Sequence, residues 1–201
     1  MSDNKLSVIV SIDVETTGES PSTASCIMIG CAVLLNIDPS LEIEKFLIQK
    51  KQWCINEIDG NKISEKCWNE FWTQNQSLWN YIKSNSVSPE VAMNDFHQFY
   101  EEITEKYHCI FVAAPSSFDW QWINCLYNKY VSEKKFSLPY SIRCYSTIKK
   151  LCLELGMSEQ FINDITCHPS LQHTHLADDD ALEQGYAYLK LTHWLKQNIK
   201  F

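Results

Sequence analysis

The sequence predicts an α/β fold in which helices flank a mixed central sheet. Three apolar, β-rich segments follow one another near the start of the chain, and later apolar segments alternate with segments of helical periodicity. No internal repeat or clear domain linker separates them. With 201 residues, 45% apolar and 21% charged, the chain suits one domain with a sizeable core. We therefore expect a single domain over residues 1–201.

The first part of the chain is expected to form an antiparallel meander of three strands. Residues 6–12 (LSVIVSI) and 26–35 (CIMIGCAVLL) are apolar and β-rich, and residues 41–48 alternate well enough for a third strand. Polar segments at residues 17–22 and 36–40 separate these strands. Short connections of this kind favour antiparallel pairing, with parallel strands following later in the chain.

The rest of the chain is expected to alternate helices with strands. Residues 63–83 carry aromatic residues at helical spacing, which we expect mainly in the core, a ligand platform being the alternative: Trp68, Phe71, Trp72 and Trp79. Ser88-Pro89-Glu90 is typical of a helix start. The further elements are predicted as a helix to about residue 106, a strand over 109–114, a helix over 118–130, a short strand over 141–145, a helix over 147–155 with Gly156 as its cap, and a helix over about 177–196.

The charge and the cysteines restrict the function and the compartment. The net charge is −8, and the 17 lysines and arginines form no dense basic run, which argues against a protein that wraps a long duplex. The nine cysteines are scattered and odd in number, which is typical of reduced thiols. The N-terminal apolar run lacks the length and flanks of a signal peptide, and no segment is long enough to span a membrane. We expect a cytoplasmic or other reducing intracellular location without a membrane partner.

Two acids at the end of the first strand are the first candidate for chemistry. Asp13 and Glu15 stand two residues apart in SIDVETTG, so on a strand both carboxylates project from the same face. Two adjacent carboxylates repel each other, and a hard divalent cation such as Mg²⁺ removes that cost. Taken alone, the pair fits two ordinary solvated acids at a strand end better than a metal site.

Further acids occur at two predicted helix starts. Asp119, in APSSFDW, follows a predicted strand, and Asp180 belongs to HTHLADDDALEQG. We expect His175 on the loop that enters the last helix and Asp180 in its first turn, with Asp178 or Asp179 as the N-cap. Acids are common at helix N-termini for capping and dipole reasons, so each motif alone also fits a structural role.

Together and in this order, the motifs resemble the DEDDh 3′-5′ exonuclease family, which includes oligoribonuclease, RNase T and proofreading exonucleases. The matching residues are Asp13, Glu15, Thr17 and Gly18 in the first motif, Phe118 and Asp119 in the second, and His175, Ala177, Asp180 and Ala181 in the third. The resemblance covers residues 6 to about 190. The pair Phe71-Trp72 is most similar to the branch of phage exonuclease A and RNase AS-type enzymes. Many relatives have Asn where this chain has Pro115, three residues before the Phe-Asp pair.

The resemblance implies a ribonuclease H-like exonuclease fold and a metal-dependent activity that releases nucleoside 5′-monophosphates from single-stranded 3′ ends. It implies that four acids hold two ions of Mg²⁺ or Mn²⁺, with Asp13 between them, and that His175 is the general base: Asp13, Glu15, Asp119 and Asp180. It also implies contacts to the substrate from Val14, Thr16, Thr17, Phe118 and Trp120. Trp120 is expected either to stack on a base or to pack within its helix.

Three questions stay open at the level of the sequence. The local cluster of Cys167, His168, His173 and His175 offers zinc as an alternative metal, although its spacing matches only half of a zinc motif. A non-catalytic nucleic-acid-binding module on a degenerate exonuclease fold is the alternative function. The partner is the 3′ end of single-stranded RNA or DNA, with RNA slightly favoured. Homodimers are common among such enzymes, but no residue pattern here indicates one.

Overall fold

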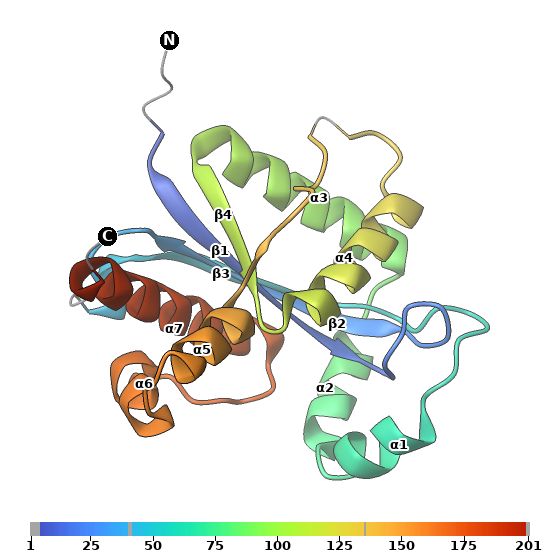
Figure 1. Ribbon diagram of the computed structural model, residues 1–201. Helices are drawn as coiled ribbons and strands as arrows, with labels where there is room; N and C mark the ends of the chain where they lie inside the picture. Colours follow the sequence, from blue (N-terminus) through green and yellow to red (C-terminus); the bar gives the residue numbers. More distant parts are fainter. Residues whose placement is uncertain (1–4, 40–41, 135, 200–201) are drawn as a thin grey trace.

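A five-stranded mixed sheet with strand order β3-β2-β1-β4-β5 lies at the centre of the protein (Figure 1). The computed structural model describes residues 5–39, 42–134 and 136–199. Strands β1 (Ser7–Thr16), β2 (Cys26–Leu35) and β3 (Leu47–Cys54) pair antiparallel. Strands β4 (His108–Ala113) and β5 (Arg143–Cys144) add parallel pairs beside β1. The predicted class, an antiparallel meander extended by parallel strands, is confirmed.

Helices cover both faces of this sheet, and Figure 1 shows α3 (Pro89–Lys106) and α4 (Ser116–Tyr130) on one side and α7 (Ala177–Asn198) on the other. Successive side chains of β1 point alternately to these two faces of the sheet. Val8, Val10 and Ile12 belong to the core beneath α3 and α4, whereas Ile9 packs in the core beneath α7. Since side chains two apart share a face of a strand, Asp13 and Glu15 are directed to the same side as α7.

The third strand differs from its prediction. The strand expected over residues 41–48 begins only at Leu47, after a short 3₁₀ helix, η1 (Ile43–Lys45); residues 40 and 41 lie outside the described part of the chain. Ile43 and Phe46 are both buried, and their spacing of three residues fits a helical turn rather than the two-residue period of a strand. The apparent alternation in this segment was therefore misleading.

The aromatic segment is divided into three short helices instead of one. These are α1 (Glu65–Cys67), the π-helical η2 (Trp68–Trp72) and α2 (Gln76–Asn85). Trp72 is fully buried, while Trp68, Phe71 and Trp79 are partly buried against the same cluster. The expected core role is therefore confirmed for Trp72 and holds in part for the other three rings.

The remaining helices lie close to their predicted positions, with one addition. Ser88 caps α3 through its hydroxyl, as Ser-Pro-Glu predicts. Helix α5 (Tyr145–Glu154) is followed by α6 (Glu159–Thr166), which sequence analysis did not anticipate. The sequence feature that indicates this helix is its N-cap residue Ser158, whose hydroxyl accepts a hydrogen bond from the backbone N–H of Phe161 at 3.2 Å. All nine cysteines carry free thiols, and no helix in the described residues is long and apolar enough to cross a bilayer.

Two glycines let α7 lie directly on the sheet. Gly30 on β2 pairs with Asp13 on β1, and a Cβ atom at Gly30 would stand 1.9 Å from the carbonyl carbon of Ala177 at the start of α7. A Cβ atom at Gly185 would stand 2.8 Å from Cβ of Ser11. At Gly30 only hydrogen fits, because the neighbours are backbone atoms, while at Gly185 side-chain atoms would have to shift. The missing side chains therefore set the distance between α7 and the strand that carries Asp13 and Glu15.

Candidate active site

Three carboxylates meet where the end of β1 faces the start of α7. Asp13 and Glu15 come from β1, and Asp180 comes from the first turn of α7. Each offers a carboxylate oxygen, and these three oxygens all lie within 4.8 Å of one another. The grouping follows from the alternation of β1 together with the close approach of α7 at Gly30. The sequence predicted these acids individually, and the fold brings them together.

Asp119 approaches the same cluster from the first turn of α4. Its side chain is 3% exposed, and within the described residues its buried Oδ2 has no hydrogen-bond partner. Asp119 lies outside the group of three whose oxygens are within 4.8 Å, yet its charge is the largest contribution to the raised pKa of Asp13 after burial. All four predicted acids therefore belong to one electrostatic unit.

The pKa values of all four acids are raised. Burial is the largest cause for each, and it raises the pKa of Asp119 to about 7. Neighbouring carboxylates then raise the pKa values of Asp13 and Glu15 further. Among the described residues, no lysine or arginine forms an ion pair with Asp13, Glu15 or Asp119. A cluster of buried acids without a compensating cation is the arrangement that a divalent metal stabilises.

Hydrogen bonds orient two of the carboxylates. The side-chain amide of Gln184 donates to Oδ1 of Asp13 at 2.6 Å, and the backbone N–H of Thr174 donates to Oδ1 of Asp180 at 3.0 Å. Sequence analysis did not single out Gln184. The available signal was its position four residues after Asp180, which places both side chains on one face of the predicted helix.

His175 lies beside the carboxylates on the loop that enters α7, as predicted. Its Nδ1 is 4.0 Å from Oδ2 of Asp180, and its side chain is 35% exposed. The ring of Phe71 meets the imidazole edge-on at 5.0 Å between centroids, and the ring of His173 does so at 4.5 Å. The backbone of His175 has φ of 60°, in the left-handed region that few residues with a side chain adopt. His175 is therefore held by ring contacts next to the acids.

The acids that precede Asp180 do not have the predicted role. Leu176 is the N-cap residue of α7, and no side chain caps this helix, so the assignment of Asp178 or Asp179 as the cap is wrong. Both carboxylates instead pair with Lys50 of β3, Asp178 at 3.1 Å. Through these ion pairs the two acids tie α7 to β3.

The predicted substrate residues are mostly buried. Val14, Thr16 and Thr17 are 6%, 8% and 1% exposed. The Thr17 hydroxyl accepts a hydrogen bond from the backbone N–H of Ser25 at 2.8 Å, and the indole N–H of Trp72 donates to the Thr16 carbonyl at 3.1 Å. These hydrogen bonds fix the end of β1.

The two aromatic candidates on α4 also face the interior. Trp120 is 8% exposed and packs against Phe111, with 5.8 Å between ring centroids. A ring this deeply buried has no face open to a base, so the stacking role predicted for Trp120 is corrected to a core role. Phe118 is half-buried and meets Trp122 edge-on. The helical spacing that predicted α4 did not show which of its faces is covered.

The Cys/His cluster considered as a zinc site does not assemble as a unit. Cys167 is exposed, and the His168 ring packs against Tyr186 at 5.2 Å. The cluster was an alternative, and only its pair of His173 and His175 comes together, beside Asp180. The contact of His173 with Asp180 had no local signal, because loop residues carry no periodicity from which contacts can be inferred.

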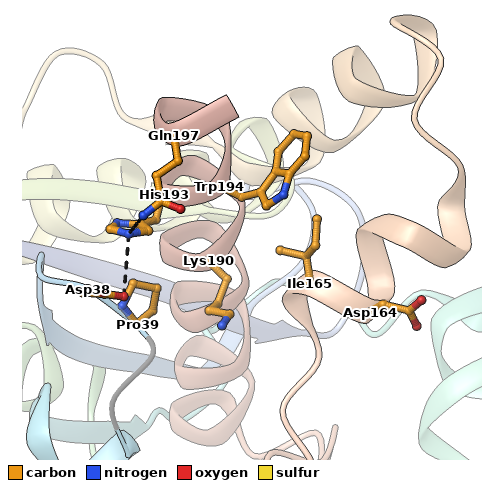
Figure 2. A pocket seen from close by; sticks show the side chains of 8 residues that line it. All are labelled: Asp38, Pro39, Asp164, Ile165, Lys190, His193, Trp194 and Gln197. Atoms are coloured by element: carbon orange, nitrogen blue, oxygen red, sulfur yellow. Dashed lines mark hydrogen bonds and ion pairs between the residues drawn. The ribbon is translucent and has the colours of Figure 1, made fainter. Parts of the chain in front are cut away.

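A surface cavity further along α7 offers a second place to look for function (Figure 2). Its volume is about 340 Å³, and it is lined by Asp38, Pro39, Asp164, Ile165, Lys190, His193, Trp194 and Gln197. Nε2 of His193 lies 3.6 Å from Oδ1 of Asp38, while Figure 2 shows Asp164 on the opposite side of the cavity. Among the described residues, no group of three or more metal ligands includes a residue of this cavity.

Comparison with known proteins agrees with this geometry. A family model described as the 3′-5′ exoribonuclease Rv2179c-like domain matches residues 8–192. No curated protein matches the chain by sequence. Similar solved structures share the fold at low sequence identity.

The structure of S. pombe Pop2p in its Mg²⁺ and Mn²⁺ bound form has 14% identity and a TM-score of 0.63, covering 96% of this chain and 86% of that one. The nuclease domain of 3′hExo, a DEDDh family member bound to rAMP, has 15% identity and a TM-score of 0.55, covering 98% and 94%. Product-bound exonuclease I has 11% identity and a TM-score of 0.62, covering 96% of this chain and 44% of that one. The predicted exonuclease fold is confirmed.

Proposed function

The chain belongs to the family of 3′-5′ exoribonuclease Rv2179c-like domains and is a 3′-5′ exonuclease, and from this we propose that it shortens single-stranded RNA one nucleotide at a time. The observation that carries the proposal is the cluster of Asp13, Glu15 and Asp180, with Asp119 beside it. RNA is preferred over DNA because the matched family is described by exoribonuclease activity. The net charge of −8 supports a short single-stranded end over a long duplex.

The residues present fit a pair of divalent cations, Mg²⁺ or Mn²⁺. The buried Oδ2 of Asp119 is without a partner among the described residues, and the cluster is rich in the oxygen ligands that hard cations prefer. Asp13, Glu15, Asp119 and Asp180 would hold the ions. When bound, the ions would activate a water molecule and neutralise charge on the leaving oxygen. Gln184 keeps the Asp13 carboxylate oriented through its donated hydrogen bond.

His175 acts as the general base in this proposal. Its Nδ1 faces Oδ2 of Asp180 at 4.0 Å, which leaves Nε2 to accept the proton of the attacking water. The rings of Phe71 and His173 limit rotation of the imidazole. The backbone from Val14 to Thr17 would contact the terminal nucleotide, and the product would be a nucleoside 5′-monophosphate.

The proposal is tested by separating the shortened strands that the protein produces. Purified protein is incubated with Mg²⁺ or Mn²⁺ and RNA or DNA of one sequence, single-stranded or duplex, labelled at the 5′ end. We expect single-stranded RNA to shorten in one-nucleotide steps from the 3′ end, more slowly as DNA and most slowly as duplex. Asp13→Asn should reduce the rate by roughly 10³-fold, because the cations contribute several kcal/mol. A shift of strand mobility without shortening would instead identify a non-catalytic binding module and contradict the proposal.

A further inference from the structure

A second group of metal-ligating side chains shares Asp180 with the carboxylate cluster. His173, His175 and Asp180 each offer a ligand atom, and these atoms all lie within 4.8 Å of one another. Nδ1 of His173 is 3.3 Å from Oδ2 of Asp180, and Nδ1 of His175 is 4.0 Å from the same oxygen. Unlike the carboxylate cluster, this group contains two imidazoles.

Glu183, on the next turn of α7, lies beside this group of three without belonging to it. Its Oε2 lies 3.2 Å from Nδ1 of His173. The side chains of His173 and Glu183 are 57% and 38% exposed, so an ion from solvent can reach them. The group therefore has a buried side formed by Asp180 and an open side formed by His173, with Glu183 next to it.

The donor set and the distances fit zinc. Zn²⁺ takes imidazole nitrogens and carboxylate oxygens in a tetrahedron, whereas Mg²⁺ and Ca²⁺ prefer oxygen alone. Bonds of about 2.0–2.1 Å place neighbouring ligands of a tetrahedral zinc roughly 3.3–3.4 Å apart. The separations of 3.3 Å and 3.2 Å around His173 already match this spacing, and Nδ1 of His175 stands slightly further out, at 4.0 Å from Oδ2 of Asp180.

We propose that His173, His175 and Asp180 form an inhibitory zinc site next to the catalytic carboxylates, with Glu183 beside its open side. The binding is argued from the geometry of the three ligands, and only its effect on activity rests on the proposed function.

The inhibition follows from the tautomer of His175. Zinc bound at Nδ1 leaves the proton of the neutral ring on Nε2, so this nitrogen is no longer able to accept the proton of water. Zinc also occupies an oxygen of Asp180, which the catalytic cations would use. Zinc in this site and a working carboxylate site therefore exclude each other.

Binding is tested first, without nucleic acid. Isothermal titration with Zn²⁺ compares the wild-type chain with Asp13→Asn, His173→Gln and, as a matched control from the same loop, His168→Gln. We expect one zinc to bind the wild type, Asp13→Asn and His168→Gln with similar affinity, and His173→Gln to bind at least tenfold more weakly. Glu183→Gln should weaken binding by a smaller factor. Equal affinity of His173→Gln and wild type would overturn the proposal, as would loss of zinc binding in Asp13→Asn.

Activity is tested next, at saturating Mg²⁺ with increasing Zn²⁺. The rate of each variant is divided by its own rate without zinc. We expect inhibition of the wild type and His168→Gln at a zinc concentration at least tenfold below the one that inhibits His173→Gln. Identical inhibition curves would place the zinc in the carboxylate cluster and reject the site. If no variant cleaves RNA in Mg²⁺ alone, the proposed function fails, while the titration still decides whether zinc binds.

Discussion

The two halves of helix α7 carry similar types of residue but lie in different surroundings. The N-terminal half, from Ala177 to Gly185, lies so close to the sheet that a Cβ atom at Gly30 would stand 1.9 Å from Ala177. It carries Asp180, which is 1% exposed. The C-terminal half lines the open cavity of about 340 Å³ with Lys190, His193, Trp194 and Gln197 (Figure 2).

The two regions differ in whether an oppositely charged or polar partner faces each acidic side chain. In the cavity, an imidazole faces a single exposed acid, as in the pair of His193 and Asp38 at 3.6 Å. At the other end of the helix, acids are gathered in the interior, and burial raises the pKa of each of them. A surface cavity is therefore a weaker indication of chemistry than a buried group of like charges. Only a ligand or a reaction explains the free-energy cost of burying such charges together.

The largest effect is expected from His175, and His193, at the cavity, is its matched control. His175→Asn should reduce the rate of RNA cleavage by roughly 10²–10⁴-fold, because asparagine tolerates the left-handed backbone but cannot accept the proton. His193→Asn, at the cavity, should leave the rate within about twofold. Initial rates between pH 6 and 9 make the measurement. Full activity of His175→Asn over that range would exclude a base at this position.

The close approach of α7 to the sheet is tested by the glycines. Gly30→Ala should reduce the free energy of unfolding by about 3 kcal/mol, because its Cβ atom meets backbone atoms of α7 that cannot move independently. Gly185→Ala should cost about 1 kcal/mol, since its nearest neighbours are side-chain atoms of Leu34 and Ser11 and alanine favours the helix. Urea unfolding gives both values. Unchanged stability of Gly30→Ala would show that α7 does not rest on β2 as described.

Because burying the acids together costs free energy, the free energy of unfolding should depend on pH. Because the pKa of Asp119 is raised to about 7 in the folded protein, the folded state holds this proton more tightly than the unfolded chain. The associated stability is complete below the unfolded pKa of 3.8 and is lost as pH rises toward 7. Asp119→Asn should therefore raise the free energy of unfolding by roughly 1–3 kcal/mol at pH 8 in EDTA, and little at pH 4.

Asp164→Asn, at the cavity, is the matched control for this change and should alter neither value by more than about 0.5 kcal/mol. A destabilised Asp119→Asn protein at pH 8 would mean that hydrogen bonds to the carboxylate outweigh the penalty of burying it. Its nuclease activity should be strongly reduced in either case.

The smallest effect concerns the lysine that ties α7 to β3. Lys50→Met removes the ion pairs to Asp178 and Asp179, which are partly exposed, so we expect a loss of about 1 kcal/mol that shrinks at high salt. Lys190→Met, at the cavity, removes a single contact over the Tyr186 ring and should cost a few tenths of a kcal/mol. Thermal unfolding at low and high salt separates the two. A salt-independent loss at Lys50 would point to packing of its alkyl chain instead.

Several features were predictable because a local pattern carries them. Apolar runs located β1, β2 and β4, and Ser88-Pro89 located the start of α3. The spacing of Asp13 and Glu15 placed both carboxylates on one face of a strand. Other features had a weak or misleading local signal: the alternation at residues 41–44 suggested a strand where Ile43–Lys45 form a helical turn, and α6 is too short to show a clear period beyond its Ser158 cap.

The sequence by itself predicted which residues would carry the chemistry and determined on which elements they stand. Four acids and one imidazole were identified from strand alternation, from helix starts and from their resemblance to a nuclease family. Only the tertiary structure decided their neighbours: Trp120 lies in the core, Lys50 binds Asp178 and Asp179, and His173 stands beside Asp180. The physical reason is that periodicity fixes directions within one element, whereas distances between elements depend on strand order and on the volume of residues such as Gly30, at the contact itself.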